Sequence, residues 1–297
     1  MRKFFASIFF ATQLLASGAD LVIFSYDRPL QLYALLESAE QHVDGIEQTV
    51  VLYRASENSY EKGYEVVAKQ FPQVSFFQQS HRRAKSDFKP LLMRALNRVC
   101  KSSYLFFAVD DIVIKDQVDL SLCISYLEKH KAEGFHLRMG KNLDYCYMLR
   151  AKQPLPDFEE LSDGVLRWQF KKGKYDWAYP HTVDCCIYRK EQILKDFSQI
   201  SFSNPNTLEA KWAGRSNYSR FGLCFATSKI VNLPLNLVNE TYQTNANMNG
   251  LTAADLLKLF NLGKKMDIAQ LSQIDNRSAH IDYEPSFVDR ESATSSL

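Results

Sequence analysis

The stretch that decides the fold is LVIFSYDRP, residues 21–29, in which an apolar run passes directly into polar residues and a proline. The run at 21–24 has no polar alternation, which is typical of a parallel strand buried on both faces. Asp27, Arg28 and Pro29 then offer a cap and a proline for a first helical turn. The stretch therefore predicts a strand, a polar loop and a helix, in that order.

The same unit recurs as far as residue 109. Apolar or β-branched runs at 49–53, 74–77 and 104–109 predict further strands, and the segments between them carry apolar residues at helical spacing. Such alternation predicts an α/β fold with a mostly parallel sheet flanked by helices. Ligands of these sheets bind at the carboxyl ends of the strands.

Composition and motifs exclude several classes of protein. The 297 residues are 46% hydrophobic and 24% charged, as in globular proteins, and 36 Lys and Arg nearly balance 34 Asp and Glu. Nucleic acid is therefore not the obvious partner. No G-x-G-x-x-G follows the first strand and no G-K-[ST] occurs, which argues against a dehydrogenase or a P-loop enzyme. Six cysteines without C-x-x-C spacing are expected to pack as small apolar side chains.

Polar side chains follow three of the predicted strands, at the edge where ligands bind. They are Ser25, Tyr26, Asp27 and Arg28 after the first strand, Arg54 after the second, and Asp110 and Asp111 after the strand at 104–109. Two adjacent carboxylates at the end of an apolar strand repel each other and are costly to desolvate, unless a cation or a hydroxyl-rich ligand is held there. A divalent ion with oxygen ligands satisfies both conditions. The alternative is that both acids are solvated loop residues.

These segments resemble glycosyltransferases with the GT-A architecture, in particular family-2-like enzymes. Residues 23–29, IFSYDRP, are similar to the opening strand and loop of that family, and Val109-Asp110-Asp111 stands where the family carries its D-x-D motif. The motif departs from the family at Val109, which replaces an acid. The resemblance implies that Asp111 binds Mn²⁺ or Mg²⁺ and that Asp110 contacts the ribose or the donor sugar.

The resemblance also implies a set of residues that bind the nucleotide and the donor. They are Ser25, Tyr26, Asp27 and Arg28 around the base and ribose, Arg54 near the base, and Lys89 near the base or diphosphate. Relatives often carry an acid near the position of Arg54, so the identity of the nucleotide stays open. Lys89 has a plain alternative role as a first-turn helix charge.

The second half of the chain holds the candidates for proton transfer. Glu209 follows Asn204-Pro205 at the start of a predicted helix, and the resemblance implies that it is the catalytic base, with Asp184 in reserve. His280 is a candidate second metal ligand from the C-terminal segment. The alternatives are a first-turn acid for Glu209 and an exposed or structural side chain for His280.

The predicted organisation has a nucleotide-binding half at 20–116, an acceptor and catalytic half of the same domain at 117–250, and C-terminal helices and a tail at 251–297. Segments 165–170 and 175–179 predict an acceptor-side hairpin. Its Trp168 and Trp177 either stack on a sugar or pack across the strands. Helices are predicted to open at Thr252 and to cover 267–274.

The N-terminus predicts an exported protein. Arg2 and Lys3 precede an uncharged stretch that ends in small residues, which indicates a signal peptide at 1–19 and a periplasmic, extracellular or lumenal location. A cytoplasmic location is expected if 1–19 is retained as structure. No stable transmembrane span is expected in the mature chain, because no later segment is long enough without charges.

Three function classes stay open. The first is a metal-dependent glycosyltransferase that transfers a sugar from a nucleoside-diphosphate donor to a hydroxyl of a glycan, lipid or protein, with inversion if Glu209 is the base. The second is an exported, non-catalytic carbohydrate-binding or interaction protein on the same scaffold. The third is a sugar nucleotidyltransferase, against which the missing glycine-rich phosphate loop counts.

Overall fold

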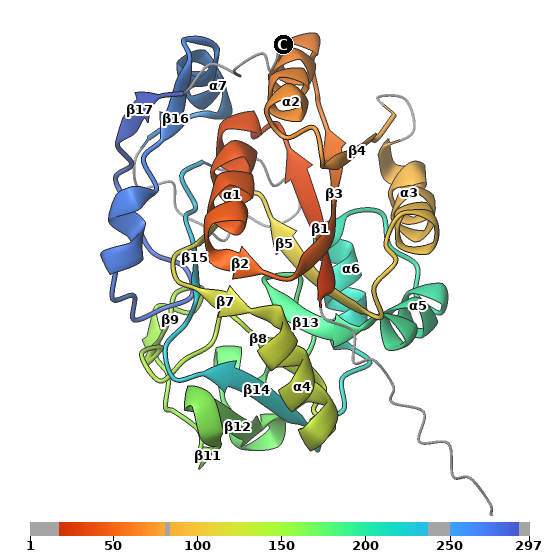
Figure 1. Cartoon of the computed structure of the whole chain (residues 1–297), viewed down its shortest axis with the longest axis vertical. Helices are drawn as coiled ribbons and strands as arrows, with labels where there is room; N and C mark the ends of the chain where they lie inside the picture. The colour runs from red at the N-terminus through yellow and green to blue at the C-terminus, as the bar shows by residue number, and fades with distance from the viewer. Residues whose placement is uncertain (1–17, 81–83, 237–249, 291–297) are drawn as a thin grey trace, which may run out of the picture.

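The structure is a computed structural model that describes residues 18–80, 84–236 and 250–290. A nine-stranded sheet runs through it in the order β11-β12-β14-β8-β13-β5-β1-β3-β4 (Figure 1). The strands of this sheet are β1 (Ala19–Tyr26), β3 (Ile46–Arg54), β4 (Ser75–Gln78), β5 (Tyr104–Val109), β8 (Gly134–His136), β11 (Glu159–Glu160), β12 (Val165–Gln169), β13 (Cys186–Arg189) and β14 (Phe221–Phe225).

Seven of the nine strands of this sheet run in the same direction, and β12 and β13 run in the opposite one. Strands β4, β3, β1 and β5 are parallel neighbours, and β8 and β14 pair in parallel further along. Strand β13 is antiparallel to both β5 and β8, and β12 is antiparallel to both β14 and β11. The predicted α/β class, with a large and mostly parallel sheet flanked by helices, is therefore confirmed.

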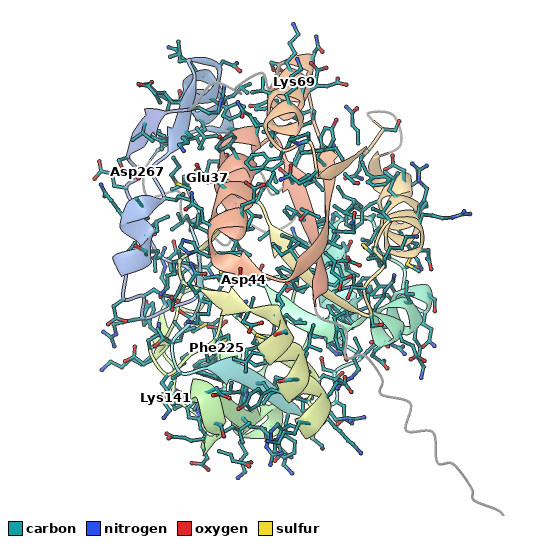
Figure 2. The ribbon with its side chains drawn as sticks, viewed as in Figure 1. Glu37, Asp44, Lys69, Lys141, Phe225 and Asp267 are labelled. Carbon is teal, nitrogen blue, oxygen red and sulfur yellow. The ribbon has the colours of Figure 1, made fainter. Side chains whose placement is uncertain are left out.

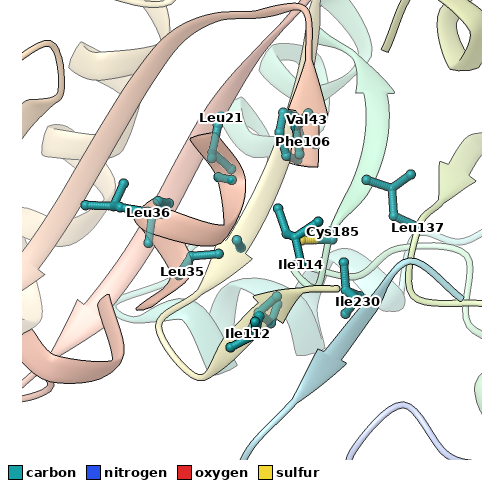
Figure 3. Close-up of a cluster of buried hydrophobic side chains, with 14 of the residues drawn as sticks. Leu21, Leu35, Leu36, Val43, Phe106, Ile112, Ile114, Leu137, Cys185 and Ile230 are labelled. Atoms are coloured by element: carbon teal, nitrogen blue, oxygen red, sulfur yellow. The ribbon is translucent and has the colours of Figure 1, made fainter. Parts of the chain in front are cut away.

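Helices cover both faces of the sheet. They are α1 (Pro29–His42), α2 (Asn58–Gln70), α3 (Ala84–Arg98), α4 (Leu120–His130), α5 (Lys190–Ser198), α6 (Pro205–Ala213) and α7 (Ala253–Asn261). Leu21 and Ile23 of β1 belong to the core that contains buried residues of α1, α2, α4 and α7. Figure 3 shows part of this core, with Leu21 near Leu35 and Leu36 of α1. Val22 and Phe24 belong to the core that contains buried residues of α3, α5 and α6. Alternate residues of β1 thus enter two cores, which explains why this strand is apolar throughout.

Short ladders complete the described fold. Strand β6 (Ile112–Ile114) pairs with β15 (Ile230–Asn232), β2 (Val43–Asp44) with β7 (Val118–Asp119), β9 (Tyr145–Cys146) with β10 (Ala151–Lys152), and β16 (Lys264–Met266) with β17 (Phe287–Asp289). The 3₁₀ turns are η1 (Ser162–Gly164), η2 (Phe170–Lys172), η3 (Tyr175–Ala178) and η4 (Ala269–Gln273). Of the predicted helices in the C-terminal segment, α7 begins after Thr252 as expected, whereas 267–274 contains only the turn η4.

The predicted hairpin at 165–179 is wrong. Strand β12 pairs with β14 and β11, and the segment after it folds into the turns η2 and η3. Trp168 donates its indole N–H to the carbonyl oxygen of Trp177 at 2.9 Å, and both rings are fully buried. Gly173 permits this return, because a Cβ there would lie 2.4 Å from the same carbonyl oxygen. The two tryptophans therefore form core and do not offer a surface for stacking on a sugar.

The predicted signal peptide falls mainly on residues 1–17, which lie outside the described residues. Its expected boundary at Asp20 lies within β1, where Ala19 is buried and donates its backbone N–H to Gly45 at 3.0 Å. The Asp20 side chain accepts a hydrogen bond from the backbone of Ser102 at 2.8 Å. Within the described ranges, the helices are all too short or too polar to cross a membrane.

Candidate functional site

The polar residues after β1 and β5 meet because these two strands are parallel neighbours. Phe24 and Val109, near the carboxyl ends of the two strands, are partners in the register. The backbone N–H of Asp110 continues the ladder by donating to Phe24 at 3.2 Å. The loop at 25–28 therefore lies against Asp110 and Asp111, as the sequence predicts for side chains at one edge of a parallel sheet.

Asp110 organises the loop that follows β1. Its Oδ2 accepts hydrogen bonds from Ser25 Oγ at 2.8 Å and from the backbone N–H of Tyr26 at 3.0 Å. Its Oδ1 accepts from Arg28 Nη1 at 2.9 Å. Tyr64 of α2 supports the same loop, since its hydroxyl lies 2.7 Å from Ser25 Oγ and accepts from the Arg28 backbone at 3.1 Å. Burial raises the pKa of Asp110, and the adjacent Arg28 opposes that rise.

Arg28 supplies the cation that the two adjacent acids require. Its Nη1 lies 2.9 Å from Asp110 Oδ1 and 3.3 Å from Asp111 Oδ2, and only 10% of its side chain is exposed. Its Nη2 donates to the carbonyl oxygen of Asn236. The sequence argument placed Arg28 beside the nucleotide and sought the cation in a metal ion. In the structure, an arginine of the chain itself lies between the carboxylates.

Asp111 retains one oxygen for a further partner. Its Oδ1 is buried and accepts no hydrogen bond from the part of the chain that the structure describes. Mg²⁺ is commonly bound by one or two carboxylates together with substrate phosphates, so this oxygen fits a divalent ion. The described residues contain no group of three His, Cys, Asp or Glu side chains that could hold a metal. The fit therefore rests on Asp111 and on oxygens from a substrate.

His280 lies in the segment beside β15. It forms an isolated parallel bridge with Asn232, and the next residue, Leu233, donates its backbone N–H to the Asp111 carbonyl at 2.7 Å. The His280 ring is half-buried and stacks on Tyr147, with 5.8 Å between the ring centroids. The backbone thus connects the segment of His280 to Asp111 through β15.

Two side chains extend the site toward β3. Asp27 adopts a left-handed backbone conformation with φ 53°, and its Oδ1 accepts from the backbone of Ser56 at 2.8 Å. This bond joins the loops after β1 and β3. The Arg54 guanidinium lies over the Tyr26 ring, 4.7 Å from its centroid. A planar cation and an aromatic ring thus form a cation–π pair at this edge of the sheet.

Lys89 has a different set of partners. Its Nζ donates to the carbonyl oxygen of Ile200 at 2.6 Å and lies 5.4 Å from the centroid of the Phe202 ring. These contacts join α3 to the segment before α6. These contacts give the side chain a packing role, and its expected contact with the base or diphosphate stays a prediction.

A second polar cluster lies next to β5, at the start of β13. The backbone N–H of Cys185 donates to Phe107 of β5 at 2.7 Å, which places Asp184 one strand away from the β5 end. Arg138 is buried and bridges two acids, with Nη1 3.0 Å from Asp184 and Nη2 2.9 Å from Asp176. Asp184, the reserve candidate for the base, is thus held in an ion pair.

Glu209 completes this second cluster from the first turns of α6. Its Oε1 accepts from the backbone N–H of Val183 at 3.0 Å. Burial, and secondly the negative charge of Asp184, raise the pKa of Glu209 to about 7, while Arg138 opposes the shift. A half-buried carboxyl that titrates near neutral pH is suited to accept a proton during catalysis.

Sequence reasoning missed Arg138 as a member of this cluster. The signal was available, because Arg138 is a charged residue in the run at 135–139, whose other residues are Phe, His, Leu and Met. A charge at such a position is rarely buried without a partner. Its partners were not predictable, since Asp176 and Asp184 lie 38 and 46 residues further along the chain.

An open cavity of about 570 Å³ lies where β4 meets α3. Its lining includes Gln79, Asp87 and Arg94, and Asp87 accepts hydrogen bonds from the Gln79 side chain at 3.1 Å and the Ser80 backbone at 2.6 Å. Because β4 is parallel to β3 and β1, this cavity lies on the same edge of the sheet as Asp110.

Fold and site together define an α/β protein whose polar groups gather where β1, β3 and β5 end and β13 begins. No protein-family model matches the sequence. Over 194 residues the chain is 27% identical to the bifunctional glycosyltransferase pgtA of Dictyostelium discoideum, which corresponds to 60% of this chain and 24% of that protein. The chain is thus similar to a glycosyltransferase and spans less than a quarter of its length.

Solved structures of TarS from S. aureus were also matched. The structure of TarS 1–349 in complex with UDP has a TM-score of 0.46 and 13% identity, and the match covers 70% of this chain and 58% of that chain. A second structure of TarS 1–349 has a TM-score of 0.44 at the same identity and coverage.

Proposed function

We propose that the chain is a glycosyltransferase that transfers a sugar from a nucleoside-diphosphate donor to a hydroxyl acceptor. The observation that carries this proposal is Glu209, a half-buried carboxyl with a pKa of about 7, placed one strand away from the polar cluster at the end of β5. The similarity to a bifunctional glycosyltransferase over 194 residues supports the same reaction class.

In this proposal the donor lies over the loop after β1. Arg28 and Asp111 face its diphosphate, whereas Tyr26, Asp27 and Arg54 surround the base and ribose. The sequence predicts that Asp110 contacts the ribose or the donor sugar. We propose instead that it positions Ser25 and Arg28, because both of its oxygens accept hydrogen bonds within the chain. Arg28 carries a fixed positive charge close to where the leaving diphosphate gains negative charge.

Mn²⁺ or Mg²⁺ is the proposed cofactor, with Asp111 as its protein ligand and His280 as the candidate for a second. When bound there, the ion would add positive charge beside the leaving diphosphate. The buried and unpartnered Oδ1 of Asp111 supports this assignment.

On the acceptor side, Glu209 takes the proton of the attacking hydroxyl. Asp184 is paired with Arg138 at 3.0 Å, and its nearby negative charge contributes to the raised pKa of Glu209. A base on the acceptor side favours direct displacement of the diphosphate, and the sugar is then transferred with inversion.

A thermal-shift panel of UDP, GDP and CMP, each with and without Mn²⁺, tests the donor site. We expect one nucleotide to raise the melting temperature, with a larger shift when Mn²⁺ is present, and Asp111→Asn to remove the metal-dependent part. Asp44→Asn is the matched control, because Asp44 is an exposed acid on β2, outside the site (Figure 2). If none of the nucleotides stabilises the wild type, the proposed donor site is wrong and a non-catalytic role on this scaffold is favoured.

A further inference from the structure

Exposed apolar side chains are concentrated in two segments that contact each other. Four of the seven large hydrophobic residues that are exposed in the described part of the chain belong to two neighbouring segments: Met148 (40% exposed), Leu149 (58%), Leu155 (42%) and Tyr175 (44%). Single apolar residues on a surface are ordinary, but a group of them marks a place where another surface binds. We call these two segments, residues 147–157 and 170–175, the apolar-basic face.

The two segments of the apolar-basic face are held together by specific contacts. Strands β9 and β10 form a hairpin that carries Met148 and Leu149 in its exposed turn. Just beyond β10, Gln153 accepts a hydrogen bond from the backbone of Asp176 at 3.3 Å, directly after Tyr175. An ion pair of 3.8 Å between Lys172 and Asp157 joins the segments again.

The same two segments carry five cations. Arg150, Lys152, Lys171, Lys172 and Lys174 are all exposed, and Asp157 is the one acid within residues 147–157 and 170–175. Other acids border the face, and they have partners of their own. Asp144 pairs with Arg277, and Asp282 accepts the hydroxyl of Tyr147. Glu159 pairs with Arg167, Glu160 with Lys141, and Asp176 with Arg138. The face therefore combines exposed apolar side chains with more cations than acids.

We propose that the apolar-basic face docks on an anionic lipid bilayer. Apolar side chains flanked by Lys and Arg are suited to the boundary between acyl chains and headgroups, where the cations meet lipid phosphates. Each Lys or Arg near an anionic surface strengthens binding, so the five exposed cations supply the electrostatic part of the attraction. Charge complementarity thus identifies the occupant as a membrane surface rich in acidic lipids.

Docking in this way would bring a bilayer close to the second polar cluster. Tyr175 on the face precedes Asp176, which binds Arg138, and Arg138 in turn binds Asp184. If the proposed function holds, an acceptor hydroxyl presented at the bilayer surface lies near Glu209. The docking itself does not depend on that function, because lipid binding needs neither donor nor acceptor.

Co-sedimentation of the whole chain with vesicles tests the docking. The wild type is expected to bind phosphatidylcholine vesicles that contain about 30% phosphatidylglycerol, and to bind pure phosphatidylcholine at least about tenfold more weakly. About 0.5 M NaCl should weaken the binding, because the Debye length then falls well below 10 Å. Two variants, Lys171→Glu/Lys172→Glu/Lys174→Glu and Met148→Ser/Leu149→Ser, should each lose at least about tenfold in affinity.

Matched controls separate the face from net charge and surface hydrophobicity. Lys62→Glu/Lys69→Glu changes two exposed lysines of α2, which lies at the opposite end of the view from β11 and β12 (Figure 1). Leu262→Ser removes an apolar side chain that is 66% exposed. Both controls should bind like the wild type. The proposal is overturned if the wild type ignores acidic vesicles, or if variants of the face that melt like the wild type bind as well as it does. Nucleotide thermal shifts are read separately, so failure of donor binding is distinguishable from failure of docking.

Discussion

Asp110 contributes more to the fold than the neighbouring Asp111. Its two oxygens accept from Ser25, Tyr26 and Arg28, and its side chain is almost entirely buried. Asp110→Asn removes the charge that pairs with a buried guanidinium, and we expect it to lower the free energy of unfolding by about 3 kcal/mol. Urea denaturation followed by circular dichroism measures this loss.

Asp111→Asn is the companion measurement. Asp111 makes one longer contact to Arg28, at 3.3 Å, and its other oxygen has no partner among the described residues. The expected loss is below about 1 kcal/mol, in keeping with a side chain reserved for a ligand. A larger loss for Asp111→Asn than for Asp110→Asn would contradict these assignments.

Glu209 is expected to set the pH dependence of turnover. Its pKa of about 7 lies above the ordinary value, so the carboxyl is protonated and inactive as a base at lower pH. The rate of sugar transfer should therefore rise with pH and level off above about 7. Glu209→Gln should lose most of the turnover while still binding the nucleotide, and the rise with pH should disappear from what remains.

The same raised pKa has a consequence for stability. Folding shifts the Glu209 pKa upward, so the folded chain binds more protons than the unfolded chain between the two pKa values. The stability that comes from this proton is present at low pH and is lost as pH rises through about 7. Glu209→Gln should therefore resist urea at about pH 8 at least as well as the wild type, and a marked destabilisation there would argue against a strained carboxyl.

At the scale of single residues, local sequence patterns identified residues of the candidate site, but they did not identify which side chains pair with one another. Asp110 and Asp111 were recognisable as carboxylates at the end of an apolar strand, and their place beside residues 25–28 followed from parallel pairing. The position of Arg28 between them was not predictable. It depends on side-chain conformations across a separation of 82 residues, and charge spacing along the sequence carries no information about those.

At the scale of elements, the capping of α6 determines how firmly Glu209 is held. Asn204 accepts from the backbone of Thr207 at 2.8 Å, and the Thr207 hydroxyl accepts from the backbone of Asn204 at 3.1 Å. Asn204→Ala should cost about 1 kcal/mol of stability and should also reduce turnover, because the first turns of α6 then fray. Urea denaturation and a transferase assay measure the two effects.

Helix α7 provides the control for this experiment. Thr252 forms the same kind of capping box with Asp255, in a helix that carries none of the candidate site residues. Thr252→Ala should cost a similar amount of stability and leave turnover unchanged. Equal losses of turnover in both variants would mean that the effect comes from general destabilisation.

The elements also mark where sequence patterns fail. Helix α6 was predictable because Asn204 and Pro205 form a strong start signal. The hairpin predicted at 165–179 does not form. Apolar and aromatic residues around a glycine are compatible with a turn between two strands, but also with a chain that folds back so that the Trp177 carbonyl meets the Trp168 indole, as it does here. Strands β16 and β17 were missed because each has only three residues, too few for a period to appear.

At the scale of the whole molecule, the six cysteines are expected to be inert. All of them are free and buried in the structure, as the sequence predicted for small apolar residues. Burial raises the pKa of the Cys100 thiol to about 12 and that of Cys123 well above its usual range. None should react with Ellman's reagent in native buffer, and all six should react in guanidinium chloride.

A reductant provides the second check on this prediction. Because no disulfide joins the six cysteines, dithiothreitol should leave the midpoint of urea unfolding unchanged. Rapid reaction of one thiol in native buffer, or a fall in the midpoint on reduction, would contradict the structure.

The order of the strands in the sheet could not be predicted from the sequence. Alternating strands and helices predicted four parallel strands, but nothing local to β13 indicates that it enters the sheet between β5 and β8 in the opposite direction. Its residues are apolar and buried, as they would be in a parallel strand. The direction follows from the chain path between β8 and β13, which is decided by tertiary packing.

The reversed strand β13 has a mechanical consequence. Because it pairs with β5 on one side and β8 on the other, β13 joins the two parts of the sheet into one continuous sheet. The cluster around Asp110 and the cluster around Glu209 thus lie at the same continuous sheet. A hinge motion that separated the two parts of the sheet here would break the hydrogen bonds between β13 and either β5 or β8. Under the proposed function, we therefore expect donor and acceptor to enter past the loops at the edge of the sheet, without a separation of β13 from its neighbours.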